Sequence, residues 1–215
     1  MAHALERLLL LLELDSGPPE PLPAIDGWEL VLAENVAYLV DDDTRAQCML
    51  ALRREVGLDP EAILSAHPEQ LLTVVAGMHP LDRVERLRRC AELRLAGAPW
   101  TSYPGIGRPG AERVELFSGE RAVLALDSNA ARVLFRLGYG ERRSSYSTMH
   151  REIQAAAQCE LPSEVAVLQR AHQLLRRHGK QICARNQPAC AVCPVRKRCA
   201  AGRGLRSVED PFAKP

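Results

Sequence analysis

Aromatic residues are scarce in this chain, since Phe, Trp and Tyr make up 4% of its 215 residues. Long hydrophobic runs are also missing. The leucine run at residues 8–12 is followed at once by Glu13 and Asp15, and no small-residue cleavage site follows it, so we expect neither a signal peptide nor a membrane-spanning helix. The remaining composition, 47% apolar and 26% charged, is ordinary for a soluble globular protein.

Negatively charged residues are missing from a long C-terminal stretch. Residues 165–208 contain no Asp or Glu, although the whole chain has a net charge of only +1. A surface of this kind suits phosphate, although a basic face that is simply solvated is the alternative. The basic residues of the stretch are Arg170, Arg176, Arg177, Lys180, Arg185, Arg196, Lys197, Arg198, Arg203 and Arg206.

Four cysteines within the basic stretch are the most informative feature of the sequence. Their spacing is C-x6-C-x2-C-x5-C, in a loop that also contains Pro188 and Pro194, so the thiolates can converge on one centre. The spacing favours an iron–sulfur cluster. Zinc is the alternative, although its usual sites have two C-x2-C pairs, and disulfides or unligated thiols are a third possibility. The four residues are Cys183, Cys190, Cys193 and Cys199.

The other three cysteines, Cys48, Cys90 and Cys159, are isolated in apolar helical contexts, where we expect buried free thiols. Free thiols and a reduced metal centre both suit a cytoplasmic protein.

Helical periodicity dominates the chain, and no convincing strand is present, so we predict an all-α fold. Four prolines at residues 18–23 indicate an extended linker after the first helix, and residues from 202 onward resemble a frayed tail. The predicted helices cover residues 3–14, 27–40, 44–56, 60–65, 68–76, 80–96, 109–117, 128–137, 148–158 and 163–178.

A Pro-Gly-Ile-Gly turn at residues 104–107 lies between two predicted helices. Backbone amides in such a turn can point outward at the N-terminus of the next helix, where they can bind a phosphate without reading a base. A plain helix cap is the alternative. Asp127 lies 22 residues after Gly105, and it too could be a simple N-cap.

The turn, the aspartate and the cysteine loop, in this order, resemble the endonuclease III branch of the helix-hairpin-helix DNA glycosylases. The resemblance covers roughly residues 26–200. It implies a six-helix barrel domain (residues 21–121), an iron–sulfur domain (residues 1–20 and 122–200) and a flexible tail (residues 201–215). It also implies that Asp127 is catalytic and that the four cysteines hold a [4Fe-4S] cluster. DNA would be bound by Gly105, Ile106, Gly107 and Arg108, with Arg196 and Lys197 from the cysteine loop.

The same resemblance suggests how a base would be flipped out of the duplex. Met78 and Leu39 match positions where the family inserts side chains into the stack, although an apolar Met is often a core residue. Glu34 falls where related adenine glycosylases have a general acid that protonates the departing base. An ordinary surface carboxylate is the alternative reading of Glu34.

One departure from the family is mechanistic. Bifunctional members have a lysine that forms a Schiff base with the sugar, and this chain has Pro109 at that position. Its only lysines are Lys180, Lys197 and Lys214. We therefore expect a monofunctional, hydrolytic glycosylase of base excision repair. The alternatives are a non-catalytic module that binds damaged DNA and an enzyme with weak lyase activity through another amine, such as the N-terminus.

A second departure is the acidic run at residues 41–43, which would weaken phosphate binding unless it caps a helix or binds a cation. We expect a monomer that acts on lesion-containing double-stranded DNA in the cytoplasm, associated with the nucleoid and not with a membrane. The lesion is not identified by the sequence.

Overall fold

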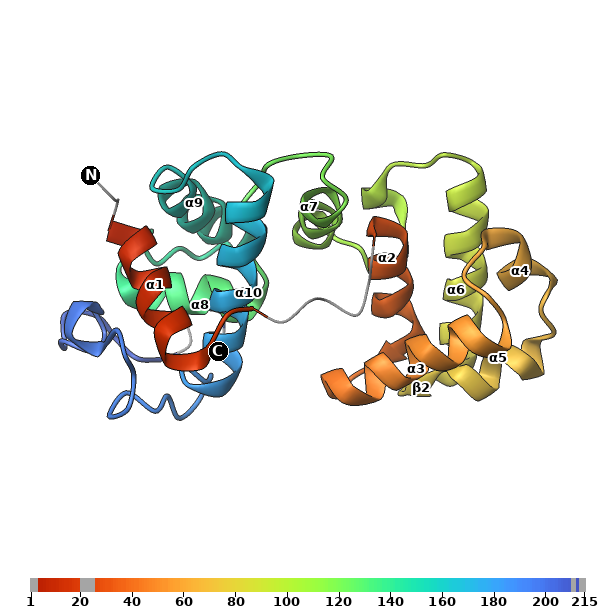
Figure 1. Cartoon of the computed structure of the whole chain (residues 1–215), viewed down its shortest axis with the longest axis horizontal. Helices are drawn as coiled ribbons and strands as arrows, with labels where there is room; N and C mark the ends of the chain where they lie inside the picture. The colour runs from red at the N-terminus through yellow and green to blue at the C-terminus, as the bar shows by residue number, and fades with distance from the viewer. Residues whose placement is uncertain (1–3, 20–25, 210–211, 213–215) are drawn as a thin grey trace. The chain divides into compact units, whose positions relative to one another are not determined.

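The computed structural model describes residues 4–19, 26–209 and 212. Within these residues it contains ten α-helices, two short 3-10 helices and one pair of two-residue strands (Figure 1). The all-α fold class is confirmed. The chain divides into two compact units: unit 1 comprises Met1–Glu20 and Glu115–Pro215, and unit 2 comprises Pro21–Val114. None of the described helices is long and apolar enough to cross a membrane.

Unit 2 is a helical unit in which α6 packs against α2, α4 and α5, and α3 packs against α2 and α5; its boundary with unit 1 falls inside α7. The helix predicted over residues 27–40 ends early, because Ala37 turns into an extended conformation and starts strand β1 (Ala37–Tyr38). That strand pairs in parallel with β2 (Ala76–Gly77). The helices are α2 (Gly27–Val36), α3 (Asp42–Glu55), α4 (Pro60–Ser65), α5 (Pro68–Val74), α6 (Pro80–Leu95), η1 (Trp100–Ser102) and α7 (Arg108–Phe117).

The acidic run at residues 41–43 has a structural role at the start of α3. Asp41 is the N-cap, and its side chain accepts a hydrogen bond of 2.7 Å from the backbone N–H of Thr44. This bond lowers the pKa of Asp41. Asp42 and Asp43 lie in the first turn, where negative charge interacts favourably with the helix dipole. Helix capping, one of the two explanations considered for this run, is therefore observed.

Unit 1 contains α1 (Ala4–Ser16), α8 (Ser128–Leu137), α9 (Tyr146–Gln158), α10 (Val165–Gln181) and η2 (Arg196–Arg198). Helix α1 packs against α10, and its core leucines are almost fully buried. Arg170 of α10 forms an ion pair with Glu13 of α1, and the backbone N–H of Leu5 donates to Glu160. The N-terminal helix is therefore held in unit 1 by apolar burial and by polar contacts at both of its ends.

Helices α8 and α10 approach each other closely at Gly179. A Cβ atom at this position would lie only 2.7 Å from the carbonyl oxygen of Asn129, which is closer than a non-bonded contact allows. The glycine therefore lets α10 pass directly over the first turn of α8.

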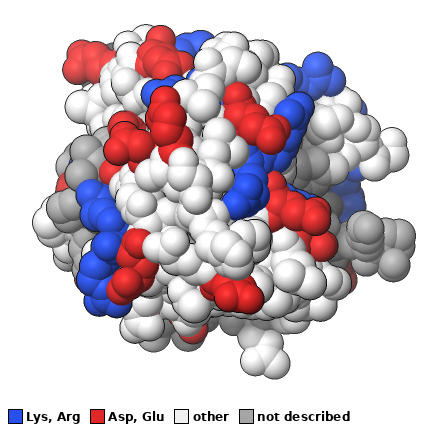
Figure 2. All heavy atoms as spheres, turned by 90° about the vertical axis from the view of Figure 1, so that its right-hand side faces the viewer, with Lys and Arg blue, Asp and Glu red and all other residues white. Residues whose placement is uncertain are grey.

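The molecular surface is mixed in charge on the face shown in Figure 2, where acidic and basic side chains lie beside one another. Such a surface gives no long-range attraction for a polyanion, because nearby opposite charges cancel. On this face, phosphate binding therefore has to come from local arrangements of residues.

Candidate catalytic and nucleic-acid site

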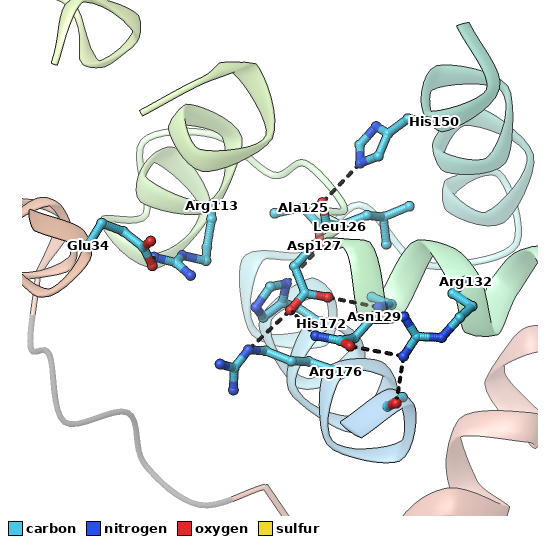
Figure 3. A network of polar contacts seen from close by, with 12 residues as sticks. Glu34, Arg113, Ala125, Leu126, Asp127, Asn129, Arg132, His150, His172 and Arg176 are labelled. Atoms are coloured by element: carbon cyan, nitrogen blue, oxygen red, sulfur yellow. Dashed lines mark hydrogen bonds and ion pairs between the residues drawn. The ribbon is translucent and has the colours of Figure 1, made fainter. Parts of the chain in front are cut away.

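Asp127 is the N-cap of α8, and its carboxylate is held from several sides (Figure 3). Oδ1 accepts a hydrogen bond of 2.8 Å from the backbone N–H of Ala130. Oδ2 lies 3.3 Å from Nδ2 of Asn129 and 3.2 Å from Nε of Arg176 on α10. The capping role considered for Asp127 is thus observed, and the side chain remains partly exposed at 24%.

The segment before Asp127 is buried but has no regular secondary structure, so its backbone needs other partners. Side chains supply them: Gln154 donates to the carbonyl of Leu124, and the ring nitrogens of His172 and His150 bond the carbonyls of Ala125 and Leu126. These bonds, of 2.8 to 3.0 Å, fix the backbone that leads into the aspartate. The two histidine contacts are visible in Figure 3.

Sequence analysis missed these three positioning residues. The available signal was the presence of polar side chains on the buried faces of α9 and α10, where all three are less than 8% exposed. Buried polar groups of this kind are almost always hydrogen-bonded, but the sequence does not show to what.

A chain of hydrogen bonds connects Asp127 to the cysteine loop. Asn129, which contacts Asp127, accepts a hydrogen bond of 2.9 Å from Nη2 of Arg132. Arg132 in turn donates to the carbonyls of Gly179 (2.7 Å) and Cys183 (3.1 Å). The residue that begins α8 and the first cysteine of the loop are therefore joined through side chains of α8 itself.

The cysteine loop is fastened to the end of α8 by Arg136, whose side chain is almost fully buried. Its guanidinium donates to the carbonyls of Cys183, Ala184 and Arg185, and Nη1 lies 3.3 Å from the Cys183 sulfur. In the other direction, the thiol of Cys199 donates to the carbonyl of Arg136. Arg136 was not singled out in the sequence.

One pocket is lined by all four cysteines of the loop. Its remaining wall is mostly apolar and includes Val133 and Leu137 of α8 and Ile182. Burial raises the pKa of Cys193 to about 11 and also raises that of Cys199, so ligation of a metal there has to displace thiol protons.

None of the seven cysteines forms a disulfide, so the disulfide alternative is not observed. Cys48 and Cys90 are buried as predicted, and burial raises the pKa of Cys90 to about 12. The prediction was wrong for Cys159, which is exposed. It follows the last residue of α9 as the C-cap, where the side chain leaves the apolar face of the helix.

The Pro-Gly-Ile-Gly turn leads directly into α7, as the hairpin interpretation requires. Gly105 has a φ of 72°, a conformation that favours glycine, and Ile106 is buried beneath the turn. Nδ2 of the fully buried Asn35 donates a hydrogen bond of 2.9 Å to the carbonyl of Pro104. This bond attaches the turn to α2. Gly107 is exposed, and Arg108 forms an ion pair of 2.8 Å with Glu112.

Leu39 and Met78 emerge beside each other from the paired strands β1 and β2. The pairing continues in a 3.3 Å bond from the N–H of Met78 to the carbonyl of Tyr38. Leu39 is 70% and Met78 51% exposed, so the core alternative for Met78 is not observed. Leu39 and His79 have φ values of 56° and 57°, a left-handed conformation that costs such residues about 1 kcal/mol or more.

Glu34 forms an ion pair of 2.6 Å with Arg113 of α7, within unit 2 (Figure 3). Its side chain is 34% exposed, so it is neither a fully solvated carboxylate nor a core residue. Arg196 and Lys197 lie in η2, exposed between the third and fourth cysteines of the loop.

The structure resembles solved DNA glycosylases over most of its length. A trapped covalent complex of endonuclease III with DNA gives a TM-score of 0.73 at 18% identity, covering 93% of this chain and 95% of the other. A thermostable thymine-DNA glycosylase gives 0.76 at 16% identity with the same coverage. A 3-methyladenine DNA glycosylase of H. pylori gives 0.62 at 15% identity, covering 83% and 98%. The chain therefore has an endonuclease III-like fold.

Sequence comparison gives a more limited match. A Methanocaldococcus jannaschii protein named "Putative DNA repair glycosylase MJ1434" is 26% identical over 98 residues, which are 46% of this chain and 42% of that protein. The chain thus matches less than half the length of this curated relative. No family model matches the sequence.

Proposed function

We propose that this protein is a helix-hairpin-helix DNA glycosylase that removes damaged or mismatched bases from double-stranded DNA by hydrolysis, in base excision repair. The observation that carries the proposal is the fixed carboxylate of Asp127, held at the start of α8 by Ala130, Asn129 and Arg176. The endonuclease III-like fold and the partial match to a protein named as a glycosylase support it.

Cleavage of the bond between base and sugar creates positive charge on the sugar in the transition state. A carboxylate that is already oriented stabilises this charge without first having to reorganise, and it can also direct water toward C1′. Because the backbone before Asp127 is tied to α9 and α10, the carboxylate meets the requirement of a fixed position.

Water is the nucleophile in this proposal, because no lysine occupies the hairpin. Pro109 stands in the first turn of α7, where a proline fits without loss of a helix hydrogen bond. The described lysines, Lys180 and Lys197, both belong to unit 1, in α10 and η2. A Schiff-base step from the hairpin is therefore not available to this chain.

Glu34 is the candidate general acid for the departing base. Its ion pair with Arg113 has to open before the carboxyl group can pass on a proton. The partial exposure of Glu34 leaves the side chain accessible to a ligand.

The hairpin turn, together with Arg196 and Lys197, would hold the DNA phosphates. Leu39 and Met78 would fill the gap that a flipped nucleotide leaves. Leu39 has a left-handed backbone conformation, and Met78 directly precedes a residue that has one, His79. Exposure of their apolar side chains to water is unfavourable, and insertion between bases would compensate for that cost.

The cysteine loop would hold a [4Fe-4S] cluster through Cys183, Cys190, Cys193 and Cys199. All four line one pocket, as a shared centre requires. Among the described residues no group of three His, Cys, Asp or Glu side chains is arranged to hold a metal ion. The preference for a cluster over zinc comes from the spacing, which has one C-x2-C pair where zinc sites usually have two. When bound, the cluster would act as a structural centre that orders the basic loop.

The proposal is tested with a panel of duplex oligonucleotides that each carry one lesion or mismatch, analysed with and without alkali after incubation. We expect at least one substrate to show alkali-dependent strand breaks, and Asp127→Asn should greatly reduce them. Tight binding without base release from any substrate would favour the second candidate, a module that only binds damaged DNA, which the missing lysine also suggests.

A further inference from the structure

Two arginines near the start of α6 have no close ion pair among the described residues, although the charge of the neighbouring Asp82 acts on Arg83. The side chains of Arg83 and Arg86 make no ion pair and no hydrogen bond with any residue that the structure describes. Arg83 is nevertheless 4% exposed, and its Nε is buried without a partner. Its one aromatic contact is with Tyr38, whose ring centre lies 5.0 Å from the guanidinium carbon.

Such an arrangement is unfavourable in the free protein. A buried cation normally has a carboxylate or several carbonyls around it, because desolvation of an isolated charge is costly. Here desolvation, and the nearby positive charge of Arg86, lower the pKa of Arg83 more than Asp82 and Tyr38 raise it. Two other arginines of the same helix have polar partners. Arg88 donates to the carbonyl of Ala66, although its Nε is also buried without a partner, and Arg89 pairs with Glu92.

The two arginines lie next to the elements proposed to contact DNA. Arg83 stacks on Tyr38, the residue directly before Leu39. Nη1 of Arg86 lies 3.6 Å from the place where a Cβ of Gly105 would be, so it adjoins the hairpin turn. The pair therefore connects the strands that carry Leu39 and Met78 with the turn.

We propose that Arg83 and Arg86 together bind a phosphate group of the DNA backbone, in addition to the amides of the hairpin. This inference rests on the proposed function, because DNA is the anion that brings phosphates to this surface. A phosphate accepts several hydrogen bonds at once, and guanidinium groups match its oxygens in a bidentate manner. It would supply the missing counter-charge, and Tyr38 would hold the Arg83 guanidinium in place.

The first test compares Arg86→Gln with Arg89→Gln, a control on the same helix whose side chain is exposed and already paired. Affinity for an undamaged duplex is measured over a range of salt concentrations. Each lost phosphate contact reduces the slope of log affinity against log salt by about 0.9. We expect this reduction for Arg86→Gln and none for Arg89→Gln. Equal slopes for wild type and Arg86→Gln would overturn the proposal.

The second test uses Arg83→Met, which replaces the buried cation with an apolar side chain of similar length. If Arg83 serves to bind a DNA phosphate and does not stabilise the fold, the variant should melt at the same or a higher temperature than the wild type in the absence of DNA. Its slope of log affinity against log salt should fall. A lower melting temperature with an unchanged slope would make Arg83 a structural residue and refute its part in the site.

These measurements are independent of catalysis, because they use undamaged DNA. If the salt slope falls in the variants but the wild-type protein releases no base, the phosphate site is supported and the glycosylase proposal is not. If the wild-type protein releases a base but the slope is unchanged in both variants, the glycosylase proposal is supported and the phosphate site is refuted.

Discussion

Nε of Arg176 lies 3.2 Å from Oδ2 of Asp127, so the carboxylate proposed to act in catalysis is also the partner of a cation from α10. The remaining contacts of Asp127, with the Ala130 N–H and with Asn129, come from α8 itself. Orientation of the aspartate is thus shared between two helices that pack tightly at Gly179. Variants of Asp127 therefore have to preserve its capping role if they are to report on chemistry.

Asp127→Asn meets that condition, because an asparagine side chain caps a helix about as well as an aspartate. We expect base release to fall about 10²-fold or more, since the negative charge that stabilises the sugar cation is lost, with DNA binding nearly unchanged. Single-turnover base release measured after alkali gives the rate. An undiminished rate would reduce Asp127 to a helix cap.

Borohydride should trap little of this protein on damaged or abasic DNA, because Pro109 occupies the position of the Schiff-base lysine. Endonuclease III, which forms a trapped covalent complex with DNA, is the positive control. The assay is gel detection of a covalent protein–DNA adduct. Efficient trapping of the wild-type protein would contradict the hydrolytic mechanism.

The purified protein should be yellow-brown and contain about four irons per chain if the cysteine loop holds the proposed [4Fe-4S] cluster. Cys190→Ser should lose iron and much of its solubility, because cluster binding and folding of the loop are coupled. Cys159→Ser is the matched control, since this cysteine is exposed and lies outside the loop. Stoichiometric zinc in a colourless, active preparation would rule out the cluster.

Leu39→Ala and Met78→Ala should slow base release from duplex DNA and have much less effect on a single-stranded substrate, where no stack has to be opened. Leu81, an exposed leucine at the start of α6, provides a control as Leu81→Ala. Equal losses on both substrates would show that Leu39 and Met78 do not act by opening the stack.

The ion pair between Arg170 and Glu13 should make the stability of unit 1 depend on pH. Arg170 lowers the pKa of Glu13, so the pair stabilises the fold above the unfolded pKa of a glutamate and is lost as the pH falls through the lower folded value. Glu13→Gln should cost about 0.5–1 kcal/mol at pH 7 and little in acid. Thermal unfolding at several pH values provides the measurement, and a pH-independent difference would exclude this ion pair as its cause.

The sequence predicted the parts of the molecule that depend on local pattern. Apolar spacing located the helices, and the Pro-Gly-Ile-Gly turn lies where the pattern placed it, with Gly105 in a glycine-type conformation. The boundary errors are physical: α2 stops at Val36 because the chain forms β1 with a strand 39 residues further on, and such a pairing leaves no mark in either segment.

The rest of the site depends on contacts between distant residues, which one sequence does not reveal. His150 and His172 hold the backbone before Asp127, and Arg136 holds the cysteine loop, yet each looks in the sequence like a polar residue on a helix. For Cys159 the local sequence was misleading. Its neighbours are apolar, so burial was expected, but the residue lies at the end of α9 and is exposed.

The division of unit 1 into two stretches has a consequence during synthesis on the ribosome. Helix α1 is synthesised before α10, and the α10 residues that bury its leucines follow some 150 residues later, which at about 5–20 residues per second is a delay of roughly 8–30 s. All of unit 2 is translated within that interval. A nascent chain with five consecutive leucines still unpacked in α1 is a natural client for a chaperone, and the yield of folded protein should depend on that protection.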